Sequence, residues 1–230
     1  MEPNVTHRST YERYNKHMRY TQNKLIALTF DDGPSDTTTD QVLDVLARHG
    51  VVGTFFLIGD NITDERLPVI RRTLSLGCEI ENHSKTHSDM RTLTREQIIS
   101  EIEYTTARIT EVTGRAPEFF RPPYIYCNDT MFDAIDLTFI CGHGCEDWEA
   151  DTTVQHRAEK TIAQAEDGAV VLLHDFEGNE KTAEALETII PALRDRGFEF
   201  VTVSELFRRK GVDLAKQRGI LFSNTSQARI

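Results

Sequence analysis

The sequence predicts an α/β fold in which parallel strands are covered by helices, as in an α/β barrel or a doubly wound sheet. Short apolar segments alternate with amphipathic helical segments along the chain, and polar residues follow the apolar segments. Parallel strands that helices bury on both faces have this apolar character. No stretch rich in Pro, Gly or Ser divides the sequence, so one domain is expected.

Seven segments are predicted to be strands. They are short and apolar, and turn-forming residues bound them. The segment 24–30, KLIALTF, is typical, and Asp-Asp-Gly-Pro ends it. The predicted strands are 24–30, 53–58, 78–81, 118–120, 138–140, 169–173 and 198–203.

Helices are predicted between these strands. The longest, 94–112, begins with the capping-box sequence Thr-Arg-Glu-Gln and is closed by Gly114. Another begins at Ser35 or Asp36 and is stopped by Gly50. The remaining predicted helices are 66–76, 129–135, 154–166, 181–194 and 204–210. Residues 1–23 are expected to form an N-terminal arm, 24–210 the domain and 211–230 a C-terminal tail.

Composition excludes several classes of function. The formal net charge of −11 argues against nucleic acid as the main partner and against an anionic membrane surface, because both need clustered Lys and Arg. No apolar run approaches the ~20 residues of a membrane span. The polar N-terminus lacks the apolar segment of a signal peptide. The chain is therefore expected to be either cytoplasmic or separated from a leader or neighbouring module. A monomer is also expected.

Ionisable residues gather directly after the predicted strands. In parallel α/β folds the functional sites lie at the C-terminal ends of the strands. Five loops are therefore expected to converge on one face. They carry Asp31-Asp32, Glu81-Asn82-His83, Arg121-Pro-Pro-Tyr124, Asp147-Trp148 and His174-Asp175.

His83 and His87 are four residues apart, and on a helical turn they share a face that reaches one metal ion. Alone, this spacing fits two surface histidines equally well. The adjacent acids Asp31 and Asp32 point in different directions at a strand end, so one can bind the metal while the other stays free. Alone, Asp-Asp-Gly-Pro is more often a tight turn with solvated acids. Together these residues predict a metal site with open coordination positions, as in catalytic zinc-type sites.

Three further residues fit proton transfer. Arg121 is the candidate that keeps the free carboxylate ionised, although it also fits a surface Arg that caps a loop. His174 follows an apolar strand and fits a general acid near neutral pH, whereas a buried neutral His is the usual alternative. Asp147 is a carboxylate that could orient His174 and raise its pKa.

These motifs, in this order and spacing, resemble those of the NodB-like polysaccharide deacetylases, which form carbohydrate esterase family four. The resemblance covers roughly residues 24–210 and implies a distorted (β/α) barrel with fewer than eight regular units. The motifs are Thr-Phe-Asp-Asp-Gly-Pro at 29–34, His83-x3-His87, Arg121-Pro-Pro-Tyr124, Asp147-Trp148 and Leu172-Leu-His-Asp175.

The resemblance implies roles for the metal-binding loops. Asp31 would be the catalytic base, oriented by Arg121. Asp32, His83 and His87 would hold one divalent metal ion, zinc or cobalt.

It also implies roles for the opposite wall of the site. The backbone N–H of Tyr124 would stabilise the oxyanion and line the substrate site. Asp147 would tune His174, the general acid. Trp148 and Leu172 would form an apolar pocket for the acetyl methyl group, although both also fit an ordinary core.

Two departures from the family pattern bear on the substrate. Ile125 stands where Gly often follows Arg-Pro-Pro-Tyr, and the fourth motif, which ends Glu146-Asp147-Trp148, lacks an extra Asp three positions before the Asp-Trp pair. This wording most resembles the acetylxylan esterase branch, so O-acetyl groups of xylan are the expected substrate, in an extracellular or cell-surface setting.

Two alternatives stay open. The first is an N-deacetylase of chitooligosaccharide or of peptidoglycan N-acetylglucosamine. The second is a non-catalytic carbohydrate-binding relative, which the retention of every proposed ligand and proton carrier disfavours. No structural metal is expected at Cys141-Gly-His-Gly-Cys145, because a second cysteine pair at zinc-ribbon spacing is missing.

Overall fold

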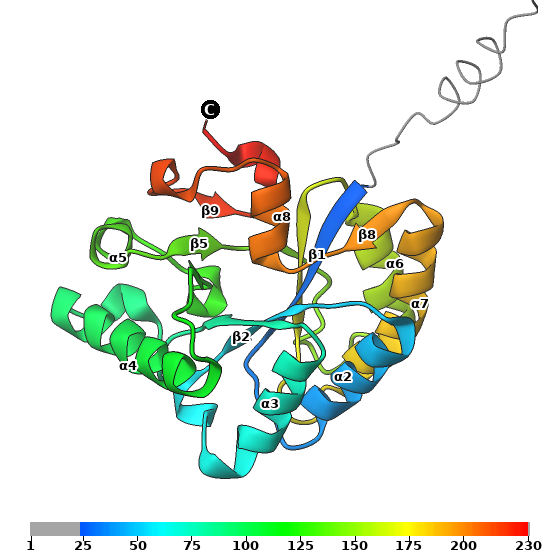
Figure 1. Ribbon diagram of the computed structural model, residues 1–230, viewed down its shortest axis with the longest axis horizontal. Coiled ribbons are helices and arrows are strands. Elements are labelled where there is room, and N and C mark those ends of the chain that lie inside the picture. The colour runs from blue at the N-terminus through cyan, green and yellow to red at the C-terminus, as the bar shows by residue number, and fades with distance from the viewer. Residues whose placement is uncertain (1–23, 230) are drawn as a thin grey trace, which may run out of the picture.

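The computed structural model describes residues 24–229, and within them the strands form one curled parallel sheet with helices around it (Figure 1). The strand order is β6-β7-β1-β2-β3-β4-β5-β9, and β8 pairs with β1. The strands are β1 (Lys24–Asp31), β2 (Thr54–Leu57), β3 (Glu79–Asn82), β4 (Phe119–Phe120), β5 (Thr138–Ile140), β6 (His143–Gly144), β7 (Ala169–His174), β8 (Phe198–Phe200) and β9 (Leu221–Phe222).

The predicted distorted barrel is confirmed, and all seven predicted strands are present. Two further strands of two residues each, β6 and β9, were not predicted. The expected arm at 1–23 lies outside the described residues.

The segment expected as a C-terminal tail contributes to the sheet as far as it is described. β9 pairs with β5, and the residues after it reach β7, where Asn224 forms an isolated antiparallel bridge with Ala169. These residues bring the two ends of the curled sheet together. The domain boundaries themselves stay a prediction.

The helices begin and end close to the predicted positions. The side chain of Thr94 accepts from the backbone of Gln97 while the Gln97 side chain accepts from the backbone of Thr94, so the predicted capping box is present. Gly50 ends the first described helix in the left-handed conformation. The helices are α2 (Thr38–His49), α3 (Leu67–Ser75), α4 (Arg95–Thr113), α5 (Asp129–Ala134), α6 (Val154–Gln164), α7 (Glu180–Asp195) and α8 (Val203–Arg209).

Alternation along the strands divides the core into an outer and an inner layer. Ile26, Leu28 and Phe30 of β1 pack with buried residues of α2, α3 and α7, and Figure 1 shows where these helices lie around the sheet. Leu25 and Ala27 point the other way, into the barrel, where residues of α8 pack against them. Successive side chains of a strand point to opposite faces, so Asp31 lies on the inner side.

The same alternation directs other polar side chains inward at the C-terminal ends of the strands. Phe119 belongs to the inner layer and Phe120 to a separate cluster beside α4 and α5, which turns the next residue, Arg121, inward. In β7, Val170 is an inner residue, so Leu172 and His174 face inward too. The strand register pairs Asp31 with His174. These residues meet at one end of the barrel.

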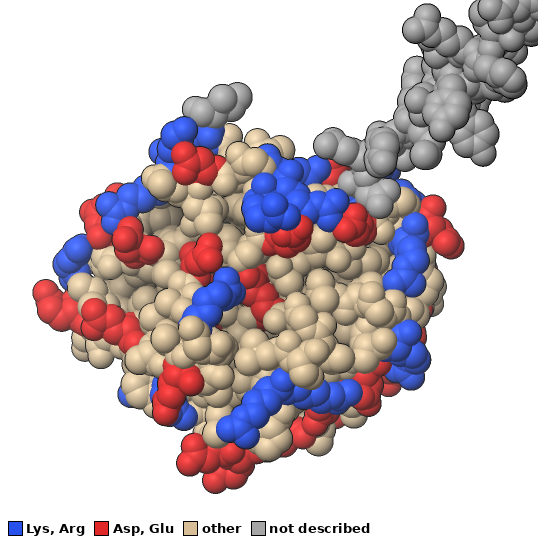
Figure 2. Space-filling model, in the orientation of Figure 1, with Lys and Arg blue, Asp and Glu red and all other residues tan. Residues whose placement is uncertain are grey.

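Charged residues of both signs are interspersed over the face seen in Figure 2 and form no single basic patch on it. Among residues 24–229, no helix has both the length and the apolar character that crossing a bilayer requires.

Candidate active site

A cavity of about 470 Å³ opens at the C-terminal ends of the strands. Its lining brings together residues that are far apart in the sequence, as the motif order predicted. Eight of the ten sequence-predicted site residues line this cavity, and the other two, Arg121 and Asp147, are buried behind it and bond Asp31 and His174. Those that line it are Asp31, Asp32, His83, His87, Tyr124, Trp148, Leu172 and His174.

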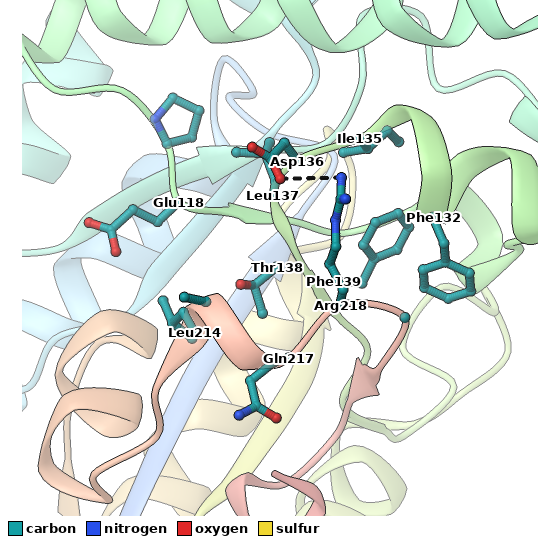
Figure 3. Close-up of a pocket in the computed structure, with 13 residues that line it drawn as sticks. Glu118, Phe132, Ile135, Asp136, Leu137, Thr138, Phe139, Leu214, Gln217 and Arg218 are labelled. Carbon is teal, nitrogen blue, oxygen red and sulfur yellow. Dashed lines mark ion pairs between the residues drawn. The ribbon is translucent and has the colours of Figure 1, made fainter. Parts of the chain in front are cut away.

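A larger cavity of about 580 Å³ lies beside the starts of β4 and β5 (Figure 3). Asp136 and Arg218 pair across part of it, with 3.4 Å between Oδ1 and Nη2. In the described part of the chain, a cluster of three potential metal ligands occurs in the smaller cavity and not here. Chemistry therefore distinguishes the smaller cavity as the candidate site.

Asp32, His83 and His87 converge as a potential metal-binding group. Their ligand atoms lie within 4.8 Å of one another. The Oδ1 atom of Asp32 is 3.2 Å from Nε2 of His83 and 3.3 Å from Nε2 of His87. This oxygen is buried and has no hydrogen-bond partner, so a cation bound by all three side chains would satisfy it.

The second ring nitrogen of His83 supports the same interpretation. Nδ1 of His83 lies 2.7 Å from the carbonyl oxygen of Arg121. A carbonyl only accepts, so Nδ1 carries the proton and the lone pair of Nε2 faces Asp32. One aspartate oxygen and two imidazole nitrogens are a donor set that suits zinc and similar divalent ions.

The expected helical turn between His83 and His87 is wrong. The two histidines lie on a loop after β3, and Ser84 and His87 have φ angles of 63° and 57°. The Ser84 hydroxyl accepts from the backbone N–H of His87. The loop reverses so that the ring centroids are 4.9 Å apart, a result that a helical face would also give. The spacing thus predicted proximity but not conformation.

Asp31 is held by a buried arginine. Nη1 of Arg121 donates to Oδ1 of Asp31 over 2.6 Å, and both side chains are buried. Another Nη donor of Arg121 bonds the carbonyl oxygen of Cys141, and the guanidinium stacks 4.3 Å above the ring of Phe56. The expected surface-Arg alternative is excluded, because Arg121 is 0% exposed.

His174 is bonded to a buried carboxylate. Nδ1 of His174 is 2.8 Å from Oδ1 of Asp147, and the backbone N–H of His174 donates to Oδ2 over 2.7 Å. Asp147 is completely buried. Although burial opposes protonation of the ring, the carboxylate outweighs it and raises the pKa of His174 to about 9. The imidazole can therefore hold a proton at neutral pH.

The ligand group has its own charge balance. Burial opposes ionisation of Asp32, but the adjacent His83 and the other histidines lower its pKa to about 2. Burial likewise opposes protonation of His83, and the carboxylates of Asp31 and Asp32 nevertheless raise its pKa. For His87, burial and the neighbouring His83 lower the pKa. Asp32 is thus an anion over the whole neutral range, which suits a cation ligand.

The comparisons with known proteins agree with this geometry. A family model described as polysaccharide deacetylase matches residues 18–138. The bifunctional xylanase/deacetylase of Pseudobutyrivibrio xylanivorans is 49% identical over 194 residues, which are 84% of this chain and 32% of that protein. The chain belongs to the polysaccharide deacetylase family. It also resembles PgdA of Listeria monocytogenes, a peptidoglycan-N-acetylglucosamine deacetylase, with 36% identity over 85% of this chain and 41% of that protein.

Two solved structures of this deacetylase family superpose closely. The Xyl-CE4 domain of a multidomain xylanase from a Trinervitermes trinervoides hindgut metagenome has a TM-score of 0.87 and 47% identity, covering 89% of this chain and 99% of that one. A family 4 acetyl xylan esterase from Clostridium thermocellum, in complex with a cobalt ion, has a TM-score of 0.84 and 41% identity, covering 87% and 98%. The chain spans under half the length of the two curated relatives above, but nearly all of each solved domain.

Tyr124 and Ile125 form a corner of this cavity. Both residues have positive φ angles, 58° and 59°, a conformation that costs free energy for residues other than Gly. Within the described residues the N–H of Tyr124 donates to no acceptor, and its ring lies 4.6 Å from the ring of His87. The corner keeps this N–H available beside the ligand group.

Trp148 and Leu172 lie on the opposite wall, together with Gly144. The Trp148 ring packs edge-on against His174 at 5.6 Å and stays 47% exposed. A Cβ at Gly144 would come within 3.2 Å of the Trp148 ring, so glycine keeps a small space open there. Leu172 is buried and also lines the cavity. It therefore belongs both to the core and to the wall of the pocket.

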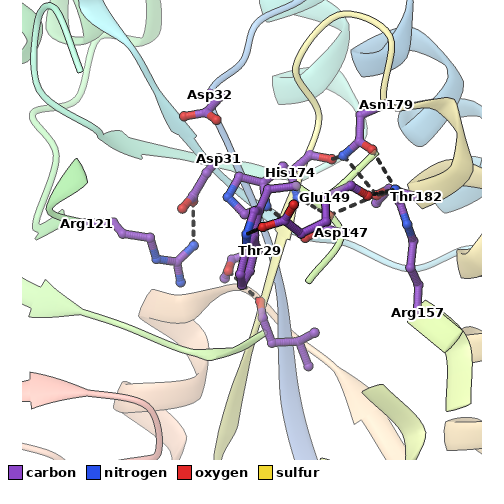
Figure 4. A network of polar contacts seen from close by, with 12 residues as sticks. Thr29, Asp31, Asp32, Arg121, Asp147, Glu149, Arg157, His174, Asn179 and Thr182 are labelled. Carbon is purple, nitrogen blue, oxygen red and sulfur yellow. Dashed lines mark hydrogen bonds and ion pairs between the residues drawn. The ribbon is translucent and has the colours of Figure 1, made fainter. Parts of the chain in front are cut away.

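The sequence reasoning missed three residues behind His174. Arg157, Asn179 and Thr182 form a buried hydrogen-bond network that reaches Asp147 (Figure 4). The one available signal was a charge on the buried face of α6, where Arg157 stands beside Ala158 and Thr161. No structural metal group forms at Cys141 and Cys145 in the described residues.

Proposed function

We propose that this chain hydrolyses acetyl groups from carbohydrate, and that O-acetyl groups of xylan are its main substrate. One observation carries the proposal: the Asp32–His83–His87 group lies in the same cavity as Asp31 and His174. A cation-binding group flanked by a buried carboxylate and a protonated imidazole provides the groups needed for hydrolysis of an ester or amide by water.

Asp32, His83 and His87 would hold a divalent ion, with zinc and cobalt as the candidates. When bound, such an ion supplies a Lewis acid that polarises the acetyl carbonyl and acidifies water. Their donor atoms fit the group, because the unpartnered Oδ1 of Asp32 and the Nε2 atoms of both histidines point to a common place.

Asp31 is the proposed base. Its Oδ1 is occupied by Arg121, which leaves Oδ2 to accept the proton of the attacking water. The hydrogen bond from the Arg121 guanidinium fixes the orientation of this carboxylate. The Tyr124 N–H is proposed to donate to the carbonyl oxygen as negative charge develops on it.

His174 is the proposed acid. Asp147 holds Nδ1, so Nε2 is the ring nitrogen left to deliver a proton to the leaving sugar oxygen or nitrogen. Trp148 and Leu172, with Gly144 between them, would enclose the acetyl methyl group.

Similarity favours xylan over the N-acetyl substrates. Relatives described as acting on xylan are 49% and 41% identical to this chain, whereas the peptidoglycan deacetylase PgdA is 36% identical. N-deacetylation of chitooligosaccharide or peptidoglycan is the second candidate, and a polymer substrate implies an extracellular or cell-surface setting. A non-catalytic binding protein is disfavoured because the residues proposed as base, metal ligands and acid all lie in one cavity.

The test is acetate release from acetylxylan, chitooligosaccharides and peptidoglycan fragments. The protein is stripped with a chelator and then supplied with zinc or cobalt. We expect stripping to abolish release, metal to restore it, and acetylxylan to be the best substrate. His87→Ala should lose release, while His49→Ala, a change of a half-buried histidine that does not line the cavity, should not. Unchanged release after complete stripping would refute the metal-dependent mechanism.

A further inference from the structure

The buried Arg157 of α6 lies behind the Asp147–His174 pair, on the side away from the cavity (Figure 4). It is only 2% exposed. No carboxylate is among its hydrogen-bond partners, which are the Asn179 side chain, the Thr182 hydroxyl and a backbone carbonyl. A buried cation without a paired acid is costly unless the structure compensates it. The compensating charge lies one hydrogen bond further on, at Asp147.

Thr182 connects the two charges. Its hydroxyl accepts from Nη1 of Arg157 over 2.9 Å and from Nδ2 of Asn179 over 3.1 Å. It lies 2.9 Å from Oδ2 of Asp147. A hydroxyl has one proton and two lone pairs, and here both lone pairs meet N–H donors. Its single proton must therefore point to Asp147.

The orientation of Asn179 is fixed in the same way. Arginine has no acceptor atom, so the Asn179 oxygen faces Nη1 of Arg157 at 2.6 Å. Its amide nitrogen must then donate, and it does so to the carbonyl oxygen of His174 and to Thr182. Arg157 thus fixes the direction of every hydrogen bond between itself and the Asp147–His174 pair.

Asp147 receives two donors on one oxygen. The Thr182 hydroxyl and the backbone N–H of His174 both donate to Oδ2. Oδ1 is left as the acceptor for Nδ1 of His174. An ionised carboxylate cannot donate, so Nδ1 keeps its proton and Nε2 is the nitrogen presented to the cavity.

We propose that Arg157 and Thr182 are positioning residues for the general acid: together they hold Asp147 so that His174 presents Nε2 to the leaving group. This inference rests on the proposed function. Neither residue lines the cavity, and both act only through Asp147. The arrangement parallels that of Asp31, which a second buried arginine, Arg121, holds directly.

The leaving group provides a selective test. A sugar alkoxide needs a proton as it leaves, whereas the 4-nitrophenolate of 4-nitrophenyl acetate leaves without one. Positioning of an acid therefore affects acetylxylan and spares the activated ester. Damage to the fold, to the ligand group or to Asp31 reduces both reactions.

Thr182→Val removes the hydroxyl and nearly keeps the volume, and Thr182→Ser is the matched control that keeps the hydroxyl. We expect Thr182→Val to lower kcat/KM on acetylxylan by about tenfold or more, below the 10²–10⁴-fold limit of general acid catalysis, and to change the activated ester less than about threefold. Arg157→Met should show the same pattern, and Thr182→Ser should resemble the unmodified chain on both substrates. Equal losses on both substrates, or no loss on acetylxylan, would overturn the proposal.

A second measurement needs neither activity nor a variant. Nitrogen-15 NMR of the histidine rings in the unmodified protein reports which nitrogen of His174 is protonated. We expect the Nδ1 proton to remain when the ring loses its second proton at high pH. Loss of the proton from Nδ1 instead would overturn the inference even if both variants failed to fold. Absence of acetate release from every acetylated sugar would refute the proposed function, while the ring signal would still decide this inference.

Discussion

Asp31 and His174 are direct neighbours in the parallel register of β1 and β7, and both side chains face the inside of the barrel. One is buried against a guanidinium and the other against a carboxylate. Two adjacent strand ends thus carry a carboxyl group and an imidazole, each held by a different partner. In the proposed mechanism, this arrangement would let Asp31 take a proton and His174 give one at the same acetyl group.

The effects of substituting Arg121 and Asp31 on the free energy of unfolding are expected to be non-additive. Arg121→Met leaves the Asp31 carboxylate buried without its cation, which typically costs about 3–5 kcal/mol. Adding Asp31→Asn should recover part of this loss, because the uncompensated charge is then removed. Urea unfolding of the two single variants and the double variant measures the coupling. Purely additive losses would contradict a direct charge interaction.

The same three variants should remain inactive on acetylxylan. Asp31→Asn removes the proposed base, and Arg121→Met removes the group that orients it. Recovered stability with unrecovered activity separates the two effects. Recovery of activity in the double variant would show that Asp31 is not the base.

The pH dependence of activity should report His174. Its pKa is raised to about 9 by Asp147, against the effect of burial. The acid works only while protonated, so kcat/KM on acetylxylan should hold below about pH 9 and fall as the pH rises through that value. Asp147→Asn removes the stabilising charge and should move this limb to lower pH. If the fall in kcat/KM stays at the same pH in Asp147→Asn, it reports the titration of another group.

Removal of the acid should discriminate between substrate classes. An amine is a poorer leaving group than a sugar alkoxide, so His174→Ala should reduce release from an N-acetyl sugar more than release from acetylxylan. General acids typically contribute 10²–10⁴-fold. Release of acetate from chitooligosaccharide and from acetylxylan is compared before and after the change. Equal fold losses on both would count against His174 as the acid.

Trp148 should set the size of the acyl group. Trp148→Ala opens the wall beside Gly144 and Leu172, so hydrolysis of a propionyl ester should rise relative to the acetyl ester. Trp148 is 47% exposed, so little stability should be lost. Tyr104→Ala is the control, since it removes another exposed ring that does not line the cavity. An unchanged propionyl-to-acetyl ratio would place the methyl group elsewhere.

Asp175 should make stability fall with pH. Burial raises its pKa to about 7, against 3.8 for the ordinary carboxyl, so the folded state binds this proton more tightly than the unfolded state. The free energy of unfolding should therefore decrease between about pH 4 and pH 7, by up to about 4 kcal/mol from this group. Asp175→Asn should flatten that decrease in chemical denaturation of metal-free protein. Asp36→Asn, on the surface, should leave it in place.

The functional residues of the site could be predicted from the sequence, because they are recognised by residue type and by their position at strand ends. The sequence located the strand before Asp31 and the strand before His174 correctly, and it placed the capping box of α4. Its local errors were the helical turn at His83–His87 and the two strands that it did not predict, β6 and β9, of which β9 lies in the expected tail. Positive φ angles at Ser84 and His87 arise from loop contacts, and those side chains carry no signal of that conformation.

By itself, the sequence determined an alternating α/β pattern and the set of groups that could bind a metal and move protons. Hydrophobic periodicity and turn residues are local features, so they can be recognised in the sequence. Only the tertiary structure decided that Arg121 meets Asp31, that Arg157 reaches Asp147 through Thr182, and that residues around Asn224 bring the sheet ends together. These contacts join residues from 25 to 90 positions apart, and strand order, register and helix packing set them. No local pattern encodes those three, because each depends on the free energy of the whole packed barrel.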